Sequence, residues 1–299
     1  HQLPTPRGGG MAIVITFLVV LTIAWYLNIV ERDLYIALTG AGGAVAAIGF
    51  MDDHGHVSAR WRLMIHFVAA FWALWWMGEP PPIQLSDVII NGEIFAAIVA
   101  AVFLVWLLNL FNFMDGIDGL AGCEAAFIAI SGAIFTWLVG SHDVALVLFM
   151  LTFATLGFLS WNWPPAKIFM GDVGSGFLGI TLGILAYASA IAGVSLWSWL
   201  ILFGVFLVDA SVTLFTRILR RTRWYEAHCS HAYQWAARKW GHLRVSFVVN
   251  LINLLWLLPL AYFTHIYPQW GWLIMLVAFT PLIFITIMLG AGRSEEKST

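Results

Sequence analysis

Three polar side chains follow one another at three-residue spacing where a long apolar run ends. Asn112, Asp115 and Asp118 lie in the segment 109–120, which begins within the last residues of the apolar run 94–113. A glycine follows each aspartate and permits a tight backbone turn. The spacing places the three side chains on one side if the helix continues. Carboxylates are costly inside a bilayer and are usually retained there for a function, so this corner is a candidate site.

Two further acidic positions end or begin apolar runs. Asp52 and Asp53 are adjacent at the end of one run, where they repel each other and lose hydration. A divalent cation or a phosphate-handling role explains such a pair, and a helix-end pair in water is the alternative. Asp172 stands before Gly-Ser-Gly and a new apolar run. It is either the N-cap of a helix or a neighbour of an anion, or its metal, bound at that helix end.

The remaining polar loops favour phosphate chemistry without requiring it. Residues 1–10 contain two prolines and three glycines, which suit either close approach to a phosphate or a flexible entry into a helix. Phe169 is either a stacking platform for a planar ring or an interfacial aromatic residue. His228 and His231 lie in the basic loop 217–244 without a further soft ligand pair, so a pyrophosphate fits them better than zinc.

Two acidic residues lie within expected spans. Glu124 lies about a turn beyond Asp118, and Asp209 lies about two turns before Arg217. Each either orients the site or faces a cavity, and the sequence alone does not decide between these roles.

The composition identifies an integral membrane protein. The 299 residues are 61% hydrophobic and only 10% charged, and the mean hydropathy is +0.88. Soluble domains usually contain about 25% charged residues. The two cysteines, Cys123 and Cys229, are far apart and indicate no disulfide framework.

We expect an all-α polytopic membrane protein that forms a single domain over residues 1–299, with its active site in cytoplasmic loops. A helix needs about 20 apolar residues to cross the hydrocarbon core. On that criterion we expect about ten spans, at residues 11–29, 34–50, 61–78, 94–113, 119–140, 143–161, 176–193, 196–217, 245–265 and 270–290.

The distribution of basic residues gives this topology an orientation. Ten spans place alternate loops on opposite faces, and one face then collects every lysine and arginine except Arg32. By the positive-inside rule that face is cytoplasmic. On the opposite face, the loop 79–93 contains an Asn-Gly turn signal and is a candidate short hairpin.

The acidic positions therefore converge on one membrane face. Hard oxygen ligands beside glycine-rich, phosphate-binding backbone indicate Mg²⁺. Charged groups are nearly absent from the middle of the spans, which argues against an ion path across the bilayer. The carboxylates that we expect to converge are Asp52, Asp53, Asp115, Asp118 and Asp172.

With these features the chain resembles the polyprenyl-phosphate N-acetylhexosamine-1-phosphate transferases. This family includes the bacterial undecaprenyl-phosphate GlcNAc-1-phosphate transferase and the phospho-MurNAc-pentapeptide translocase. The resemblance covers essentially the whole chain, and its His231-Ala-Tyr-Gln segment looks like the branch that begins O-antigen synthesis. The motifs that carry it are Pro-Thr-Pro-Arg-Gly-Gly-Gly (4–10), Asp52-Asp53, Asn112-Phe-Met-Asp115-Gly-Ile-Asp118-Gly, Phe169-Met-Gly-Asp172-Val-Gly-Ser and the late histidine loop.

The resemblance implies a reaction and its partners. The phosphate of undecaprenyl phosphate attacks the sugar-linked phosphoryl group of a UDP-N-acetylhexosamine, which yields undecaprenyl-diphospho-N-acetylhexosamine and UMP. The implied cofactor is Mg²⁺, with Mn²⁺ as an alternative. The implied location is the bacterial inner (cytoplasmic) membrane, in contact with membrane lipid and with the site facing the cytoplasm. We expect no nucleic acid partner, and a homodimer remains open.

The resemblance also implies a role for each motif residue. Metal binding falls to Asp172 and Asn112, and stacking on uracil falls to Phe169. Deprotonation or orientation of the lipid phosphate falls to Asp52 or Asp53, and a covalent aspartyl route is the alternative. The remaining substrate contacts fall to Asp115, Asp118, His228, His231 and Arg7.

Three departures from the family pattern qualify the resemblance. Some members have a lysine where this chain has His56, so a phosphate contact there is in doubt. The run of three histidines of the translocase is absent, which argues against a MurNAc-pentapeptide donor. The family has a helix before the first loop, so we expect one more helix upstream. A polytopic transporter and a lipid-binding scaffold are the competing functions.

Overall fold

The structure is a computed structural model of the 299-residue chain. It describes residues 5–55, 57–81, 83–85, 88–90, 93–222 and 228–293. Several residues of the sequence analysis lie outside this part of the chain. They are His56, Asn91, Gly92, Arg223 and the first four residues.

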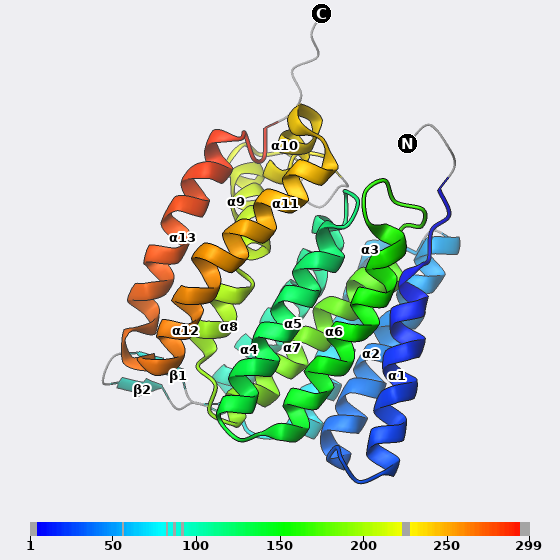
Figure 1. Cartoon of the computed structure of the whole chain (residues 1–299), viewed down its shortest axis with the longest axis vertical. Helices are drawn as coiled ribbons and strands as arrows, with labels where there is room; N and C mark the ends of the chain where they lie inside the picture. The colour runs from blue at the N-terminus through cyan, green and yellow to red at the C-terminus, as the bar shows by residue number, and fades with distance from the viewer. Residues whose placement is uncertain are drawn as a thin grey trace, which may run out of the picture.

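The described chain is almost entirely helical (Figure 1). In order, the helices are α1 (Gly10–Tyr26), α2 (Arg32–His54), α3 (Ala59–Met77), α4 (Glu93–Met114), α5 (Leu120–Leu138), α6 (His142–Asn162), α7 (Asp172–Ile191), α8 (Leu196–Leu202), α9 (Gly204–Leu219), α10 (Ala232–Trp240), α11 (His242–Ile252), α12 (Leu258–Ile266) and α13 (Gly271–Met288). A π-helical turn, Asn253–Leu257, joins α11 to α12, and a 3₁₀ turn, Pro268–Trp270, precedes α13.

A helix is present at each of the ten expected spans, but the count of ten is not confirmed. Seven helical segments of the described chain are long and apolar enough to cross a membrane. The pair α8 and α9 adds an eighth if it is one span, bent by 74° at its break. The remaining expected spans correspond to α1, which has only 17 residues, and to α3, which begins with Arg60 and Arg62.

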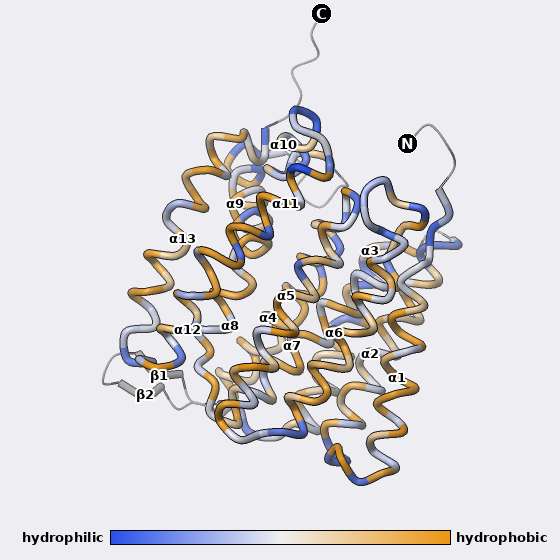
Figure 2. The backbone as a smooth tube through the Cα atoms, viewed as in Figure 1, coloured by the Kyte–Doolittle hydropathy of each residue, from blue (hydrophilic) through white to orange (hydrophobic). Residues whose placement is uncertain are grey.

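The long helices run alternately up and down between two polar ends (Figure 1). The start of α1, the end of α13 and α10 lie at one end, and the strands lie at the other (Figure 1). The helices are hydrophobic along their middles and hydrophilic at both ends (Figure 2). The end that holds α10 is the face to which the sequence assigns most lysines and arginines.

Helix α7 occupies the middle of the bundle and begins at the polar end that holds the termini. It packs against α1, α2, α4 and α5 and is buried along nearly its whole length. Close approach of α2 requires a glycine at position 49. A Cβ there would lie 2.6 Å from the carbonyl oxygen of Asp172. Gly49 thus brings the end of α2, with Asp52 and Asp53, directly beside the start of α7.

The expected hairpin in the loop 79–93 is confirmed, but its turn lies elsewhere. Strand β1 (Ile83–Leu85) pairs antiparallel with β2 (Val88–Ile90), and Leu85 faces Val88. The chain therefore reverses between these two residues, before the Asn-Gly pair that suggested the turn.

Candidate active site

A cavity of about 350 Å³ opens beside the start of α7. Five segments that are far apart in the sequence contribute to its lining. Seven of its lining residues belong to the set that the sequence singled out: Arg7, Asp53, Asn112, Asp115, Asp118, Phe169 and Asp172. The others are Gly116, Ile117, Asn162, Gly171 and His242.

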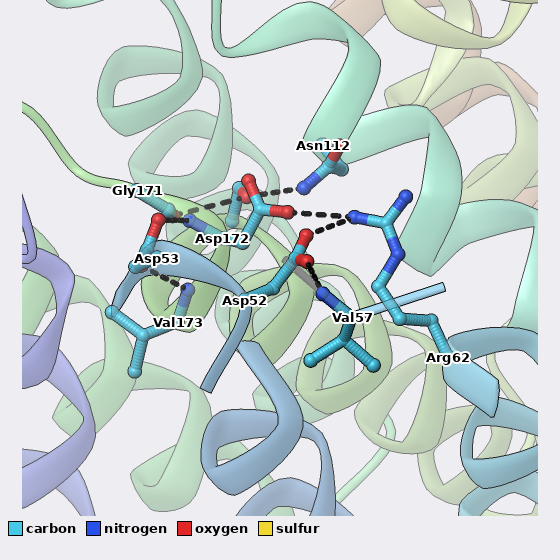
Figure 3. A network of polar contacts seen from close by, with 9 residues as sticks. Asp52, Asp53, Val57, Arg62, Asn112, Gly171, Asp172 and Val173 are labelled. Carbon is cyan, nitrogen blue, oxygen red and sulfur yellow. Dashed lines mark hydrogen bonds and ion pairs between the residues drawn. The ribbon is translucent and has the colours of Figure 1, made fainter. Parts of the chain in front are cut away.

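Asp53 caps the N-terminus of α7 from the neighbouring helix. Its two carboxylate oxygens accept hydrogen bonds from the backbone N–H groups of Asp172 (3.0 Å) and Val173 (3.1 Å) (Figure 3). These N–H groups have no partner within their own helix. Gly171 precedes them with a φ of +76°, and a Cβ there would lie 2.6 Å from Asp53 Oδ2. Asp172 is therefore the first residue of the helix and not its N-cap, which frees its side chain for the cavity.

Asp52 points away from its neighbour and is held by Arg62. Its carboxylate accepts hydrogen bonds from the backbone N–H of Val57 (2.9 Å) and from the Arg62 guanidinium. The same Arg62 nitrogen lies 3.0 Å from Asp172 Oδ2, so the arginine joins the two carboxylates (Figure 3). Asp52 is not among the residues that line the cavity. In the sequence analysis Arg62 contributes only to the positive-inside pattern. Its contacts with Asp52 and Asp172 were not predicted.

Asn112 reaches the start of α7 from the end of α4. Its Nδ2 donates to Ser175 Oγ (3.3 Å), and that hydroxyl donates to the carbonyl of Gly171 (3.2 Å). Helix α4 ends at Met114, so the chain from Asn112 to Asp118 does not continue as one helix. All three residues of the spaced set nevertheless line the cavity, because the turn folds back over it.

Asp118 links its own turn to the loop before α7 and to the start of α11. Its Oδ2 accepts a hydrogen bond from the backbone N–H of Ala166 (3.0 Å), and its Oδ1 lies 3.3 Å from His242 Nδ1. Asn162 strengthens the same junction by accepting from the N–H of Gly119 (3.0 Å). His242 has no local sequence signal, because its partner is more than 120 residues earlier in the chain.

The glycine-rich first loop pairs with the loop before α7. The N–H groups of Gly9 and Gly10 donate to the carbonyls of Phe169 and Met170, each at 2.9 Å, and the N–H of Phe169 donates to Pro6 (2.9 Å). This short backbone ladder places Arg7 and Phe169 at the cavity. The loop before α1 and the loop before α7 thus meet at the membrane face on which the sequence predicts that the acidic positions converge.

The carboxylates at the cavity lie close enough to affect one another's ionisation. Desolvation raises the pKa of the Asp115 carboxyl well above its usual range, and the nearby Asp172 and Asp53 carboxylates raise it further. An added cation would reverse these effects, because it stabilises each ionised carboxylate.

The donor set fits a partly coordinated hard cation. Within the described part of the chain, no three His, Cys, Asp or Glu side chains are grouped closely enough to hold a metal ion by themselves. Magnesium usually takes one or two protein carboxylates and completes its shell with water and substrate phosphates. The Asp172 carboxylate and the Asn112 amide oxygen suit that partial role.

The two predicted histidines form a separate cluster. His231 Nδ1 lies 3.3 Å from Asp209 Oδ1, and both residues are buried. The His228 ring stacks on His231 with centroids 5.0 Å apart. Burial, helped by His231 and Arg217 and opposed by Asp209, lowers the pKa of His228 to about 4, so its ring is neutral near pH 7. Neither histidine lines the cavity.

The fold and the cavity define a polytopic membrane protein with an acidic site at one end of its bundle. The sequence model of glycosyl transferase family 4 matches residues 33–190, more than half of the chain. The chain belongs to this family.

Three similar curated proteins are named as sugar-phosphate transferases, and two of the names include a polyprenyl phosphate. The chain is 27% identical to a probable undecaprenyl-phosphate N-acetylglucosaminyl 1-phosphate transferase of Bacillus subtilis, over 74% of the chain and 62% of the relative. It is 33% identical to a phospho-N-acetylmuramoyl-pentapeptide-transferase of Gluconobacter oxydans, over 62% and 59%. It is 31% identical to a decaprenyl-phosphate N-acetylglucosaminephosphotransferase of Mycolicibacterium smegmatis, over 75% and 62%. The chain therefore spans less than two thirds of the length of these relatives.

Proposed function

We propose that this protein transfers N-acetylhexosamine-1-phosphate from a UDP-N-acetylhexosamine to undecaprenyl phosphate. The products are undecaprenyl-diphospho-N-acetylhexosamine and UMP. We place the reaction at the cytoplasmic face of the bacterial inner membrane, where a soluble nucleotide meets a lipid headgroup. We further propose that it starts O-antigen synthesis, as the His231-Ala-Tyr-Gln segment suggests.

One observation carries the proposal. Seven residues that the sequence singled out, from four separate segments, line a single cavity at the end of the bundle where the positive-inside rule places the cytoplasm. The family membership and the activities for which the relatives are named support the same reaction class.

Phosphoryl transfer depends mainly on positioning and on neutralising charge, and the cavity is built for both. Mg²⁺, with Mn²⁺ as an alternative, would be held by Asp172 and Asn112 and would neutralise the charge of the donor diphosphate. Phe169 offers a ring for the uracil, and Arg7 offers a positive charge to a phosphate. Asp115 and Asp118 shape the nucleotide end of the cavity.

The two adjacent aspartates divide their tasks in this proposal. Asp53 lines the cavity, and it is the better placed of the two to face the acceptor phosphate. Asp52 acts through Arg62, whose guanidinium also contacts Asp172. The proposal therefore makes Asp52 and Arg62 positioning residues. His228 and His231 lie outside the cavity, so a contact of theirs with the diphosphate or the sugar requires movement of the loop that carries them.

The test is release of UMP by purified protein in lipid nanodiscs with undecaprenyl phosphate and Mg²⁺. The donor panel comprises the UDP derivatives of GlcNAc, FucNAc and QuiNAc, together with UDP-MurNAc-pentapeptide. We expect at least one N-acetylhexosamine donor to react and EDTA to stop the reaction. Release that persists in EDTA contradicts the metal assignment, and turnover with only the pentapeptide donor replaces the proposed substrate. No release with any donor favours a transporter or scaffold.

A further inference from the structure

A buried acid in α5 and a buried amide in the π-helical turn after α11 meet outside the cavity lining. Asn253 Nδ2 donates a hydrogen bond to Glu124 Oε2 at 2.5 Å, and both residues have no exposed surface. The other oxygen of each group, Glu124 Oε1 and Asn253 Oδ1, finds no hydrogen-bond partner among the described residues. Two buried acceptors without a donor are costly, and an unpaired carboxylate inside a span is more costly still.

A single proton would satisfy both acceptors. If Oε1 of Glu124 carries the proton, it donates to Asn253 Oδ1 while Asn253 Nδ2 donates to Oε2. The acid and the amide then close a ring of two parallel hydrogen bonds and carry no net charge. Among the described residues, no lysine, arginine or histidine forms an ion pair with Glu124 that would stabilise its ionised form.

We infer that Glu124 is a neutral carboxylic acid paired with Asn253, and that this pair fixes the register of α11 against α5. Nearer the cavity, α11 also contacts the turn before α5 through two residues that both reach Asp118. Ser246 Oγ donates to the carbonyl of Asp118 (3.1 Å), and His242 Nδ1 lies 3.3 Å from Asp118 Oδ1. Residues 242, 246 and 253 are spaced by four and seven, so they share one face of the helix.

The backbone around Asn253 shows why the register needs such a contact. Asn253 begins the π-helical turn Asn253–Leu257, which precedes Pro259. Proline lacks the N–H of a regular helix and clashes with the carbonyl four residues earlier, so the wider turn accommodates it. A one-residue change of register at this turn rotates the preceding helix by about 100° and removes His242 from Asp118. Glu124 is thus a positioning residue for the cavity.

Infrared spectroscopy of the full chain tests the proton without any activity measurement. We expect the difference spectrum between the wild type and Glu124→Gln to show the loss of one protonated-carboxyl band that is sensitive to exchange into D₂O, distinct from any band that Asp115→Asn removes. The matched control is Thr264→Val, which removes another buried interhelical contact, with Ser198 (2.8 Å), and should retain the band. A spectrum that Glu124→Gln leaves unchanged overturns the inference.

Binding of UMP, measured by calorimetry, tests the positioning role and rests on the proposed function. Glutamine can form the same ring with Asn253, so we expect Glu124→Gln to bind UMP within about threefold of the wild type. Alanine cannot, and we expect Glu124→Ala to bind UMP about tenfold more weakly, because a change of register would displace both Ser246 and His242 from Asp118. If Glu124→Ala does not fold, Asn253→Ala provides the same comparison.

Equal weakening by glutamine and alanine, or unchanged binding in the folded alanine variant, overturns the positioning role. Absence of UMP binding to the wild type counts against the proposed function instead. In that case the infrared result still decides whether Glu124 holds a proton.

Discussion

Two helices at the same end of the bundle share a cap from another helix and yet differ in what they can do. The N-terminus of α7 is capped by Asp53 from α2, and the N-terminus of α10 is capped by Asp209 from α9. In both cases a carboxylate from another helix accepts two backbone N–H groups, at 2.9 to 3.1 Å.

The difference lies in what surrounds the cap. Asp209 also accepts from Thr213 (3.0 Å) and contacts His231, and its side chain is only 5% exposed. Its hydrogen-bonding capacity is therefore filled by the protein. At α7, the neighbouring Asp172 side chain is 33% exposed and Asp115 adds a further carboxylate at a cavity. A capped helix end is thus structural when its carboxylate is saturated, and it becomes a candidate site when further charge and space remain.

The largest effect is expected at the N-terminus of α7, which borders the cavity. Asp172→Asn removes a charge that faces the cavity but no cap, because Asp53 holds the helix end. We expect turnover to fall about a thousandfold, or about 4 kcal/mol. Initial rates of UMP release measure the effect, and an unchanged thermal midpoint is the control. A loss of less than tenfold would remove Asp172 from the catalytic machinery.

At the N-terminus of α10, the corresponding change should lower stability and not the chemistry. Asp209→Asn places an amide against two backbone donors and His231, and we expect it to destabilise the protein by about 3 kcal/mol. The thermal unfolding midpoint in detergent measures this change. A variant as stable as the wild type that has lost UMP release would mean that α10 belongs to the reaction and that the two ends are alike.

Gly171 tests the geometry of the open cap. Alanine at this position must adopt a φ of +76° and meet Asp53 Oδ2 at 2.6 Å. We expect a loss of stability of about 2 kcal/mol. The matched control is Gly43→Ala in α2, where no atom lies within 4 Å of the added carbon. If both variants unfold at the same temperature, the contact between α2 and α7 is looser than described.

The smallest effect is expected at His242. Alanine there removes the contact with Asp118 Oδ1 but leaves the bond from Ala166 N–H in place. We expect UMP to bind about threefold more weakly, or by less than 1 kcal/mol. Calorimetry measures the dissociation constant. The control is His142→Ala, at the start of α6, whose other end carries the cavity residue Asn162. An equal effect in both variants would remove His242 from the nucleotide end of the cavity.

The sequence predicted the helical positions well because each span carries a long apolar run that the bilayer requires. The predicted topology also placed the loops of these site residues on one face, and the structure brings seven of them to one cavity while Asp52, His228 and His231 lie outside its lining. It did not predict that Asp53 would cap α7 across 119 residues, or that Asp52 would turn toward Arg62. These pairings depend on how closely α2 packs on α7, and the spacing of residues within one segment does not contain that information.

The span count differed for a related reason. The arginines at the start of α3 lower its hydropathy and count against a membrane span. One of them, Arg62, forms ion pairs with both Asp52 and Asp172. Likewise, the sequence of α8 and α9 is one continuous apolar run. Its hydropathy does not predict the bend of 74° between the two helices.

The central claim is that the acidic cavity binds a nucleotide diphosphate through a divalent ion. The most direct measurement is the dissociation constant of UDP by calorimetry, with Mg²⁺ and then with EDTA, in the wild type and in Asp172→Asn. We expect Mg²⁺ to tighten binding to the wild type at least about tenfold and to have no effect on Asp172→Asn. Equal affinity with and without Mg²⁺, or a magnesium effect that survives in Asp172→Asn, would contradict the account.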